Sequence, residues 1–167
     1  MKNSLSYEYA LHSLIAMALL PEHMNITIKQ LSFMLGVTNT YLAKIFTQLG
    51  KAGLISTSLG SKGGISLAIP AEDITFYDVY SAINGKGHMF QCANIRGLSR
   101  GLEVLPGMCE VHSTIWEAEK QMFDRLKMTT IKDMATIAMK NNKLEDENTR
   151  YALVKQLITA YEDSLNN

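Results

Sequence analysis

Residues 27–68 read TIKQLSFMLGVTNTYLAKIFTQLGKAGLISTSLGSKGGISLA, and this stretch decides the fold of the chain. Its first half predicts two short helices. Thr27 and Thr38 are each placed to cap a helix start, and apolar residues follow both at helical spacing. Gly36 is expected to end the first helix, since glycine tolerates the left-handed conformation that a helix end requires. Two helices joined by so short a turn indicate a helix-turn-helix.

The second half of the stretch predicts a β-hairpin. Residues 54–58 and 65–69 are expected to form its strands, and the glycine-rich segment 60–64 is expected to form the turn between them. Pro70 would end the second strand, because proline cannot donate a ladder hydrogen bond. A hairpin that directly follows a helix-turn-helix is a wing. The stretch therefore predicts a winged helix-turn-helix in a mainly α fold.

The second helix and the hairpin turn carry the chemistry of a DNA-binding surface. Residues 26–68 hold four lysines and neither Asp nor Glu, whereas the whole chain has a formal net charge of zero. Short polar side chains suit base edges and phosphates, and lysines suit the DNA backbone. The residues expected to contact double-stranded DNA are Thr38, Asn39, Thr40, Tyr41, Lys44, Ser61, Lys62, Gly63 and Gly64. The pattern leaves one alternative open, a protein–protein adaptor with this fold that has lost DNA binding.

Several motifs resemble those of the Rrf2 family of bacterial winged-helix regulators. They are V-T-x-x-Y-L-x-K at 37–44, K-A-G-L-I at 51–55, G-S-K-G-G-I-S-L-A at 60–68, Y-A-L-H at 9–12 and I-T-F-Y-D-V at 74–79. The likeness covers about residues 5–138. It implies a DNA-binding transcriptional regulator. An enzyme is not expected, since no nucleophile–base pair, pair of acids or complete metal-ligand set can be assembled from the sequence.

The composition excludes a membrane protein and a protein built on disulfides. Apolar residues make up 47% of the 167 residues, enough for one core with an extension, but no apolar run is long enough to span a bilayer. A secretory signal is not seen, and the chain has only two cysteines. We therefore expect a cytoplasmic protein that does not associate with membranes.

Four parts are expected along the chain. They are a winged helix-turn-helix DNA-binding domain at 1–84, a sensor loop at 85–109, a dimerisation helix with a following helix at 110–140 and a C-terminal helical extension at 141–167. Helical periodicity is absent over residues 86–109, and a long irregular segment in a compact domain is usually functional. In the extension, apolar residues recur over 149–165 with near-heptad spacing. We expect this last helix to dock on the dimerisation helix or on its twin in a partner chain.

The resemblance implies a homodimer in which the long helices of two chains cross in antiparallel fashion. Such a dimer would place two recognition helices in successive major grooves of a palindromic operator. Trp116 and Phe123 are candidates for interface anchors, and burial within one chain is an equally fair interpretation of both. We expect the dimer to act as a repressor.

A sensor is expected at Cys92, Cys109 and His112. The family members that bind iron–sulfur clusters carry three cysteines before the long helix, and some add a histidine three residues after the last one. Cys92 matches the first cysteine, Cys109 the last and His112 the histidine, whereas the middle cysteine is missing. Three interpretations stay open: a thiol switch, an iron–sulfur cluster with an atypical ligand such as Glu103 or Glu110, and inert cysteines. The first two interpretations imply a response to redox, iron–sulfur or nitrosative signals. The third implies a family member that does not sense through its cysteines.

Overall fold

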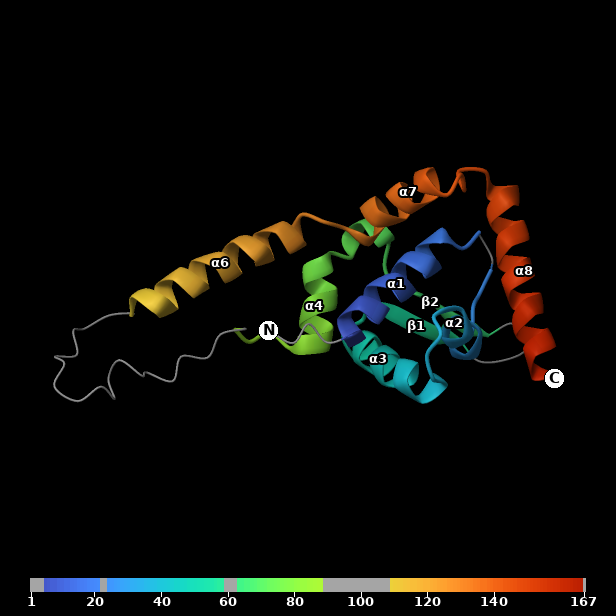
Figure 1. Ribbon diagram of the computed structural model, residues 1–167, viewed down its shortest axis with the longest axis horizontal. Coiled ribbons are helices and arrows are strands. Elements are labelled where there is room, and N and C mark those ends of the chain that lie inside the picture. Colours follow the sequence, from blue (N-terminus) through green and yellow to red (C-terminus); the bar gives the residue numbers. More distant parts are fainter. Residues whose placement is uncertain (1–4, 22–23, 59–62, 89–108, 167) are drawn as a thin grey trace.

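The computed structural model describes residues 5–21, 24–58, 63–88 and 109–166. These residues are mainly helical and contain one two-stranded antiparallel sheet (Figure 1). The elements are α1 (Leu5–Leu19), α2 (Ile28–Met34), α3 (Asn39–Lys51), β1 (Ile55–Ser58), β2 (Gly64–Leu67), the short 3₁₀ helix η1 (Ala71–Asp73), α4 (Phe76–Asn84), α6 (Glu110–Lys127), α7 (Ile131–Asn141) and α8 (Glu147–Leu165). The predicted fold class, a mainly α winged helix-turn-helix followed by further helices, is confirmed. No helix in these ranges is long and apolar enough to cross a membrane.

Threonines begin both helices of the helix-turn-helix, as predicted. The Thr27 hydroxyl accepts the backbone N–H of Gln30, and the Gln30 side chain accepts the backbone N–H of Thr27, which completes a capping box. Thr38 caps α3 by accepting the N–H of Tyr41 at 3.3 Å. Between the helices, Gly36 adopts a φ of +65°, the left-handed conformation that turns the chain from α2 into α3.

The wing is the antiparallel pair β1–β2. Ile55 lies opposite Leu67, and Ser58 lies opposite Gly64. Both strands are one residue shorter than the sequence predicts, although the backbone N–H of Ala68 still donates to the Leu54 carbonyl at 3.1 Å just beyond them. Leu54, which was expected to begin the first strand, is instead a buried core residue just before it.

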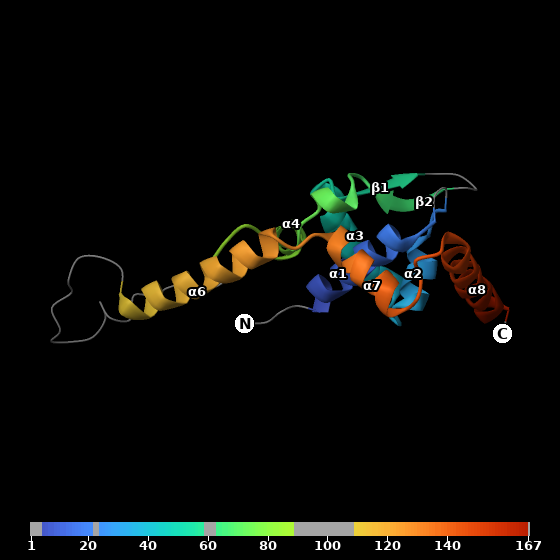
Figure 2. The ribbon, with the colours of Figure 1, turned by 90° about the horizontal axis from the view of Figure 1, so that it is seen from above.

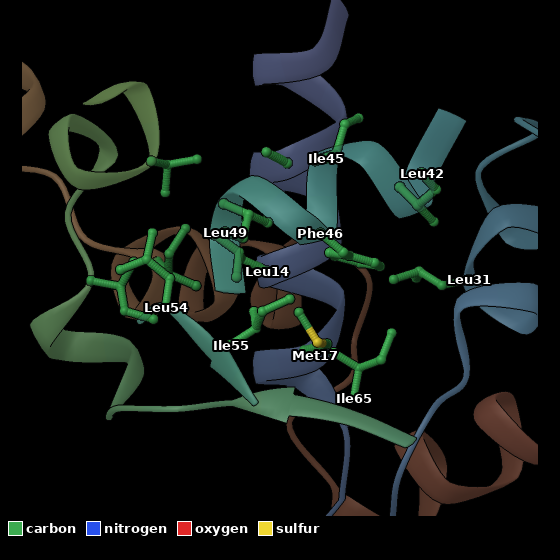
Figure 3. Close-up of a cluster of buried hydrophobic side chains, with 14 of the residues drawn as sticks. Leu14, Met17, Leu31, Leu42, Ile45, Phe46, Leu49, Leu54, Ile55 and Ile65 are labelled. Carbon is green, nitrogen blue, oxygen red and sulfur yellow. The ribbon is translucent and has the colours of Figure 1, made fainter. Parts of the chain in front are cut away.

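One hydrophobic core joins α1, α2, α3 and the wing (Figure 3). The residues labelled there are Leu14 and Met17 of α1, Leu31 of α2, Leu42, Ile45, Phe46 and Leu49 of α3, and Leu54, Ile55 and Ile65 of the wing segment. Full burial of one such side chain contributes about 1.5–3 kcal/mol to folding. The recognition helix α3 is therefore held by its apolar side, and its other side is left for solvent or a partner.

Two later helices close the domain around α1. Both α4 and α7 pack on α1, and Ile131 at the start of α7 is fully buried. Backbone hydrogen bonds join the segments that lead into these two helices. The N–H of Phe76 donates to the Thr129 carbonyl, and the N–H of Ile131 donates to the Ile74 carbonyl, both at 2.9 Å. The chain thus returns to the winged-helix domain after α6.

The helices α6 and α8 lie at opposite ends of the molecule (Figures 1 and 2). α6 contacts α4, whereas α8 packs against α2, where the rings of Tyr161 and Phe33 meet edge-to-face at 5.7 Å. Within the chain, the last helix therefore does not dock on the long helix as expected, and docking on the long helix of a partner chain stays a prediction. α8 also begins earlier than predicted, because the Asp146 carboxylate caps it by accepting the N–H of Thr149 at 2.7 Å.

Candidate DNA-binding surface and sensor helix

The outer face of α3 is a stripe of exposed polar residues. Thr40, Lys44, Thr47 and Lys51 follow one another at spacings of four, three and four residues, so their side chains share one side of the helix. All four are exposed, while the opposite side carries the core residues. This α3 stripe presents two hydroxyls and two ammonium groups, which are groups that contact bases and phosphates in protein–DNA complexes.

The structure gives different surroundings to the five helix residues predicted to contact DNA. Thr40 and Lys44 lie on the α3 stripe. Thr38 is also exposed, but its hydroxyl is used to cap the helix. Asn39 is exposed at the first position of α3, and its Oδ1 accepts a hydrogen bond from the hydroxyl of the buried Ser32 of α2. The Asn39 side chain therefore also ties the two helices together.

Tyr41, the fifth of these residues, lies on the side of α3 that faces α1. Its hydroxyl is 2.9 Å from the hydroxyl of Ser6, and its ring meets that of Tyr9 edge-to-face at 5.7 Å. These contacts leave the side chain half-buried. Tyr41 therefore first serves to hold the recognition helix on α1, and only the exposed part of its ring is accessible to DNA.

Thr47 and Lys51 were not predicted from the sequence, although a signal was present. They continue the helical spacing that begins with Thr40 and Lys44. Both border a groove of about 510 Å³ between α3 and β1, and Ser56 lines its strand side. The groove extends the polar surface of α3 onto the wing.

The positive charge of this surface is not neutralised by neighbouring acids. Lys29, Lys44 and Lys51 are exposed and form no ion pair with any residue in the described ranges. Residues 26–68 contain no Asp or Glu that could compensate them. Uncompensated lysines around a helix-turn-helix attract the phosphate backbone and steer DNA toward this face.

The wing tip is only partly within the described residues. Ser61 and Lys62, two predicted DNA contacts, lie outside them. Gly63 and Gly64 are half-buried, and Gly64 is the first residue of β2. The structure therefore places two of the four predicted wing residues, both at the base of the turn.

Gly64 has a packing role within the domain. A Cβ atom at this position would lie 2.9 Å from the Cβ of Asn25 and 2.9 Å from the carbonyl oxygen of Ile26. This close approach allows Ile65 to donate its backbone N–H to that same carbonyl at 2.8 Å. The glycine thus seats the wing on the segment that precedes α2.

Gly64→Ala is expected to lower the free energy of unfolding by about 1–3 kcal/mol, because backbone atoms must move to admit the methyl group. Urea unfolding followed by circular dichroism measures this change. Gly50→Ala is the matched control, since a Cβ at Gly50 of α3 would meet only the side chain of Ile55, at 4.0 Å. The control should be neutral or stabilising by up to about 1 kcal/mol. An equally neutral Gly64→Ala would contradict the packing role.

Cys109 and His112 lie together at the start of α6. Cys109 is the N-cap residue, and its Sγ accepts the backbone N–H of His112 at 3.4 Å. Both residues are half-buried. Cys92, the other predicted sensor residue, lies outside the described residues. The structure therefore brings together two of the three residues at which a sensor is predicted.

The described donors do not by themselves fit an iron–sulfur cluster. Such a cluster needs a full set of thiolate ligands, some of which imidazole can replace. Within the described ranges, no group of three or more His, Cys, Asp and Glu side chains is arranged to hold a metal ion. Cys109 is the one cysteine in these ranges, so this part of the chain supplies only part of a ligand set.

A cluster of side chains surrounds Trp116, one turn beyond His112. The centroid of the Trp116 ring lies 4.0 Å from that of His88 and 5.9 Å from that of His112. His88 Nδ1 is 2.7 Å from Oε1 of Glu119, whose side chain is only 6% exposed. The cluster fastens His88, which lies near the start of the predicted sensor loop 85–109, to α6. It was not predicted, because residues 88 and 119 are far apart in the sequence.

Aromatic rings connect α6 with α4 and α1. The centroid of Phe123 lies 5.2 Å from that of Tyr80 of α4, which in turn lies 5.7 Å from that of Tyr7 of α1. Burial raises the pKa of Tyr80, and the Glu119 carboxylate raises it further. Burial also raises the pKa of Tyr7 to about 12, and its hydroxyl donates to the Phe76 carbonyl at 3.0 Å. Both phenols therefore stay neutral near pH 7, and ionisation does not disturb these contacts.

An apolar seam on α6 is left uncovered by the other described elements. Val111, Ile115, Ala118 and Met122 recur at spacings of four, three and four residues, the pattern of a helix face that pairs with another helix. Val111 is 64% exposed and Ile115 is 36% exposed. We call these four residues the α6 seam.

The predicted interface anchors make contacts within the chain. Phe123 packs against Tyr77 and Tyr80 of α4, with ring centroids 5.1 and 5.2 Å apart. Trp116 stacks on His88 and remains 39% exposed. Both therefore lie on the face of α6 that turns toward its own chain, and the α6 seam is the better candidate for a partner contact.

The structure defines a winged-helix DNA-binding protein, because it combines a helix-turn-helix with a β-hairpin wing and an outer helix face that carries lysines. Residues 4–137 match the Rrf2 family, which is described as an iron-dependent transcriptional regulator, and the chain belongs to this family. It is therefore a transcriptional regulator, as predicted from its motifs, and not an enzyme.

Two relatives show how far the sequence likeness extends. A protein of Lactococcus lactis named as the HTH-type transcriptional regulator YffB is 32% identical over 145 residues, which cover 86% of this chain and 93% of the relative. The similarly named YwgB of Bacillus subtilis is 40% identical over 91 residues, 54% of this chain and 58% of that protein. The match to YwgB thus spans less than two thirds of its length.

Solved structures share the fold. IscR of T. potens has a TM-score of 0.65 at 22% identity, covering 84% of this chain and 90% of that one. CymR, the global cysteine regulator of B. subtilis, has a TM-score of 0.64 at 22% identity, covering 82% of this chain and 98% of that one. At such low identities the likeness establishes the winged-helix fold, and it does not identify the signal to which this chain responds.

Proposed function

We propose that this chain is a homodimeric repressor that binds a palindromic operator and responds to a redox, iron–sulfur or nitrosative signal at Cys92, Cys109 and His112. Membership of a family described as iron-dependent regulators supports a signal of this kind. The pair formed by Cys109 and His112 at the start of α6 supplies the chemical groups.

The proposed DNA contact uses the outer face of α3 and the wing. In a homodimer on a palindrome, two α3 helices enter successive major grooves. Thr40 and Lys44 then meet bases and phosphates, and Thr38, Asn39 and Tyr41 contribute from the start of the helix. The wing segment 61–64 follows the backbone or the minor groove, with Lys62 supplying charge.

The observation that carries the sensor proposal is a series of ring contacts, joined along the helices α6 and α1, that leads from the start of α6 to α3. It begins at Cys109, the cap of α6, and follows the helix to Phe123, whose ring reaches Tyr7 of α1 through α4. On α1, the nearby Tyr9 meets Tyr41 of α3. A shift of α6 thus has a route of packed side chains to the recognition helix.

The chemistry of the signal is tested first by purification without oxygen. Absorbance between roughly 320 and 460 nm, with stoichiometric iron and sulfide, would establish a cluster. A colourless, iron-free protein after anaerobic reconstitution would leave the two interpretations without a cluster. Mass analysis of Cys92 and Cys109 after peroxide treatment then separates a thiol switch from inert cysteines.

Cys109→Ala is expected to remove the response to the signal while preserving DNA binding. For the unchanged protein, the affinity for the DNA upstream of its own gene should differ by about 5–150-fold between reduced and peroxide-treated states. Fluorescence anisotropy measures both affinities, and the variant should show one value. Cys109→Ser keeps a capping oxygen and excludes a loss of the helix start, while Ser113→Ala on the same helix is the control that keeps the response.

Two results would contradict the proposal in different ways. A response that survives both Cys109 variants would remove the sensor role of this residue. Failure of the unchanged protein to retain its upstream DNA in either state would favour the adaptor alternative.

A further inference from the structure

The last helix, α8, and the winged-helix domain together border a small apolar cavity that is partly open to solvent. The cavity has a volume of about 90 Å³. Its walls include Leu19, the last residue of α1, the following Leu20, Met34 of α2, and Leu153, Val154 and Leu157 of α8. α8 lies beyond residue 137, where the match to the family ends. The cavity is thus formed jointly by the family domain and by a segment outside that match.

The size and lining of the cavity favour a small apolar ligand. Packed protein interiors rarely leave a void larger than a water molecule. An apolar cavity stays dry and accepts small hydrocarbons, and one of about 150 Å³ holds benzene. A volume of about 90 Å³ therefore suits a chain of a few carbon atoms. No described residue of α8 is fully buried, so the helix leaves room between itself and the domain.

Arg150 is the one charged residue in the lining of this cavity. Its Nη1 donates to the carbonyl oxygens of Leu144 and Glu145 at 2.8 and 2.9 Å, which uses both hydrogens of that nitrogen. Nη1 also lies 3.7 Å from Sδ of Met139. Within the described ranges, no hydrogen bond is made by Nε or Nη2, and no carboxylate lies within ion-pair distance of the guanidinium. Asp146, whose pKa is lowered mainly by its hydrogen bonds with Thr149, is the nearby acid that the guanidinium also influences. A half-buried guanidinium with one edge open is suited to hold a carboxylate through two hydrogen bonds.

We propose that this cavity binds a short aliphatic carboxylate, with its alkyl chain among Met34, Val154 and Leu157 and its carboxylate on Arg150. The ligand would fill the gap between α8 and the domain and so fasten α8 to α2. Its charge is complementary to the single cation of the site, and its tail is complementary to the aliphatic walls.

Binding at this cavity would reach the DNA-binding surface through α2. Met34 lines the cavity, and elsewhere on the same helix the fully buried Leu31 packs in the core that holds α3. Ser32 adds a hydrogen bond from α2 to Asn39, the first residue of α3. A ligand that prefers one position of α2 therefore shifts the affinity for DNA, by a route that does not involve the cysteines.

The probe is isovalerate, and its matched neutral analogue is 3-methyl-1-butanol, which has the same carbon skeleton without the charge. The readout is the methyl signal of Met34 in protein labelled with carbon-13 at methionine methyl groups, assigned with Met34→Leu. We expect isovalerate to shift this signal saturably, with a Kd on the order of 1 mM. The alcohol should bind about tenfold more weakly, because it lacks the charge-assisted hydrogen bonds.

Two variants, each checked for folding by circular dichroism, distinguish the contribution of the Arg150 charge to binding from that of the cavity volume. Arg150→Gln should weaken isovalerate about tenfold and leave the alcohol unchanged. Leu157→Phe should fill the space and abolish the response to both molecules. Equal isovalerate affinity in Arg150→Gln, an unaltered response in Leu157→Phe, or no saturation below about 10 mM would overturn the site.

The coupling to DNA is tested with the same probe. Saturating isovalerate should change the affinity of the unchanged protein for its upstream DNA by about fivefold, and should not do so in Leu157→Phe. An unchanged affinity at saturation would overturn the coupling. DNA binding without isovalerate depends only on the proposed repressor function, so failure of that function is distinguishable from failure of the cavity.

Discussion

Lys44→Glu is expected to lower the affinity for operator DNA by about 100-fold or more. Lys44 lies in the middle of the exposed α3 stripe and forms no ion pair with a described residue. A glutamate at this position removes an attraction to a phosphate and adds a repulsion. A homodimer carries the change twice, and a loss of about 1–3 kcal/mol at each site accounts for the size of the effect.

Fluorescence anisotropy with operator DNA, repeated over a range of salt concentrations, measures this change. The slope of log K against log salt should become shallower by about 1 for each phosphate that no longer meets a lysine. Lys132→Glu is the matched control, because it reverses the charge of an exposed lysine on α7, which packs on α1. The control should keep its affinity within about threefold. If Lys44→Glu binds DNA as the unchanged protein does, α3 does not face the DNA.

The helix-turn-helix could be predicted from the sequence because its signals are local. Thr27 and Thr38 each accept a hydrogen bond from a backbone N–H only three residues ahead, so the chemistry of each cap is contained in a short segment. The same holds for Gly36, whose left-handed φ depends on the absence of its own side chain. No distant neighbour is needed for any of these features.

The surroundings of the site residues depend on distant neighbours, and here the sequence was insufficient. Tyr41 looks like a base-contacting residue until Ser6, 35 positions away, is found beside its hydroxyl. Gly64 was predicted to allow a close approach to DNA, yet a Cβ at this position would clash with Asn25 and Ile26 of the same chain. Helical spacing alone also revealed the apolar side of α8 but not the surface against which it packs.

α6 shows the same limit in a form that bears on assembly. Its sequence carries two apolar faces, one with Trp116 and Phe123 and the other being the α6 seam. Periodicity cannot tell which face meets the chain itself and which is left for a partner. The contacts of Phe123 with Tyr77 and Tyr80 assign the first face to the chain itself. This leaves the seam for the proposed homodimer.

Ile115→Asp is therefore expected to raise the dissociation constant of the dimer by about 1,000-fold or more. Ile115 is the central large residue of the α6 seam and is 36% exposed in the single chain, so the substitution should cost little in folding. In a symmetric dimer the seam of each chain meets the other, and burial of each isoleucine contributes about 2 kcal/mol. The two carboxylates would also lose hydration in an apolar interface, which adds to the effect.

Sedimentation velocity measures the oligomeric state. Loss of the dimer should lower the affinity for DNA by about 100-fold or more, because two linked DNA-binding domains bind far more tightly than one. Ile137→Asp is the matched control: it places the same charge on another exposed isoleucine, 49% exposed on α7, and should leave both the dimer and DNA binding unchanged. A dimeric Ile115→Asp protein would show that the chains associate through another surface. A monomer that keeps full affinity for a palindromic site would instead show that dimerisation does not position the two recognition helices. The route from Cys109 along α6 could then not act by changing the position of a second DNA-binding domain.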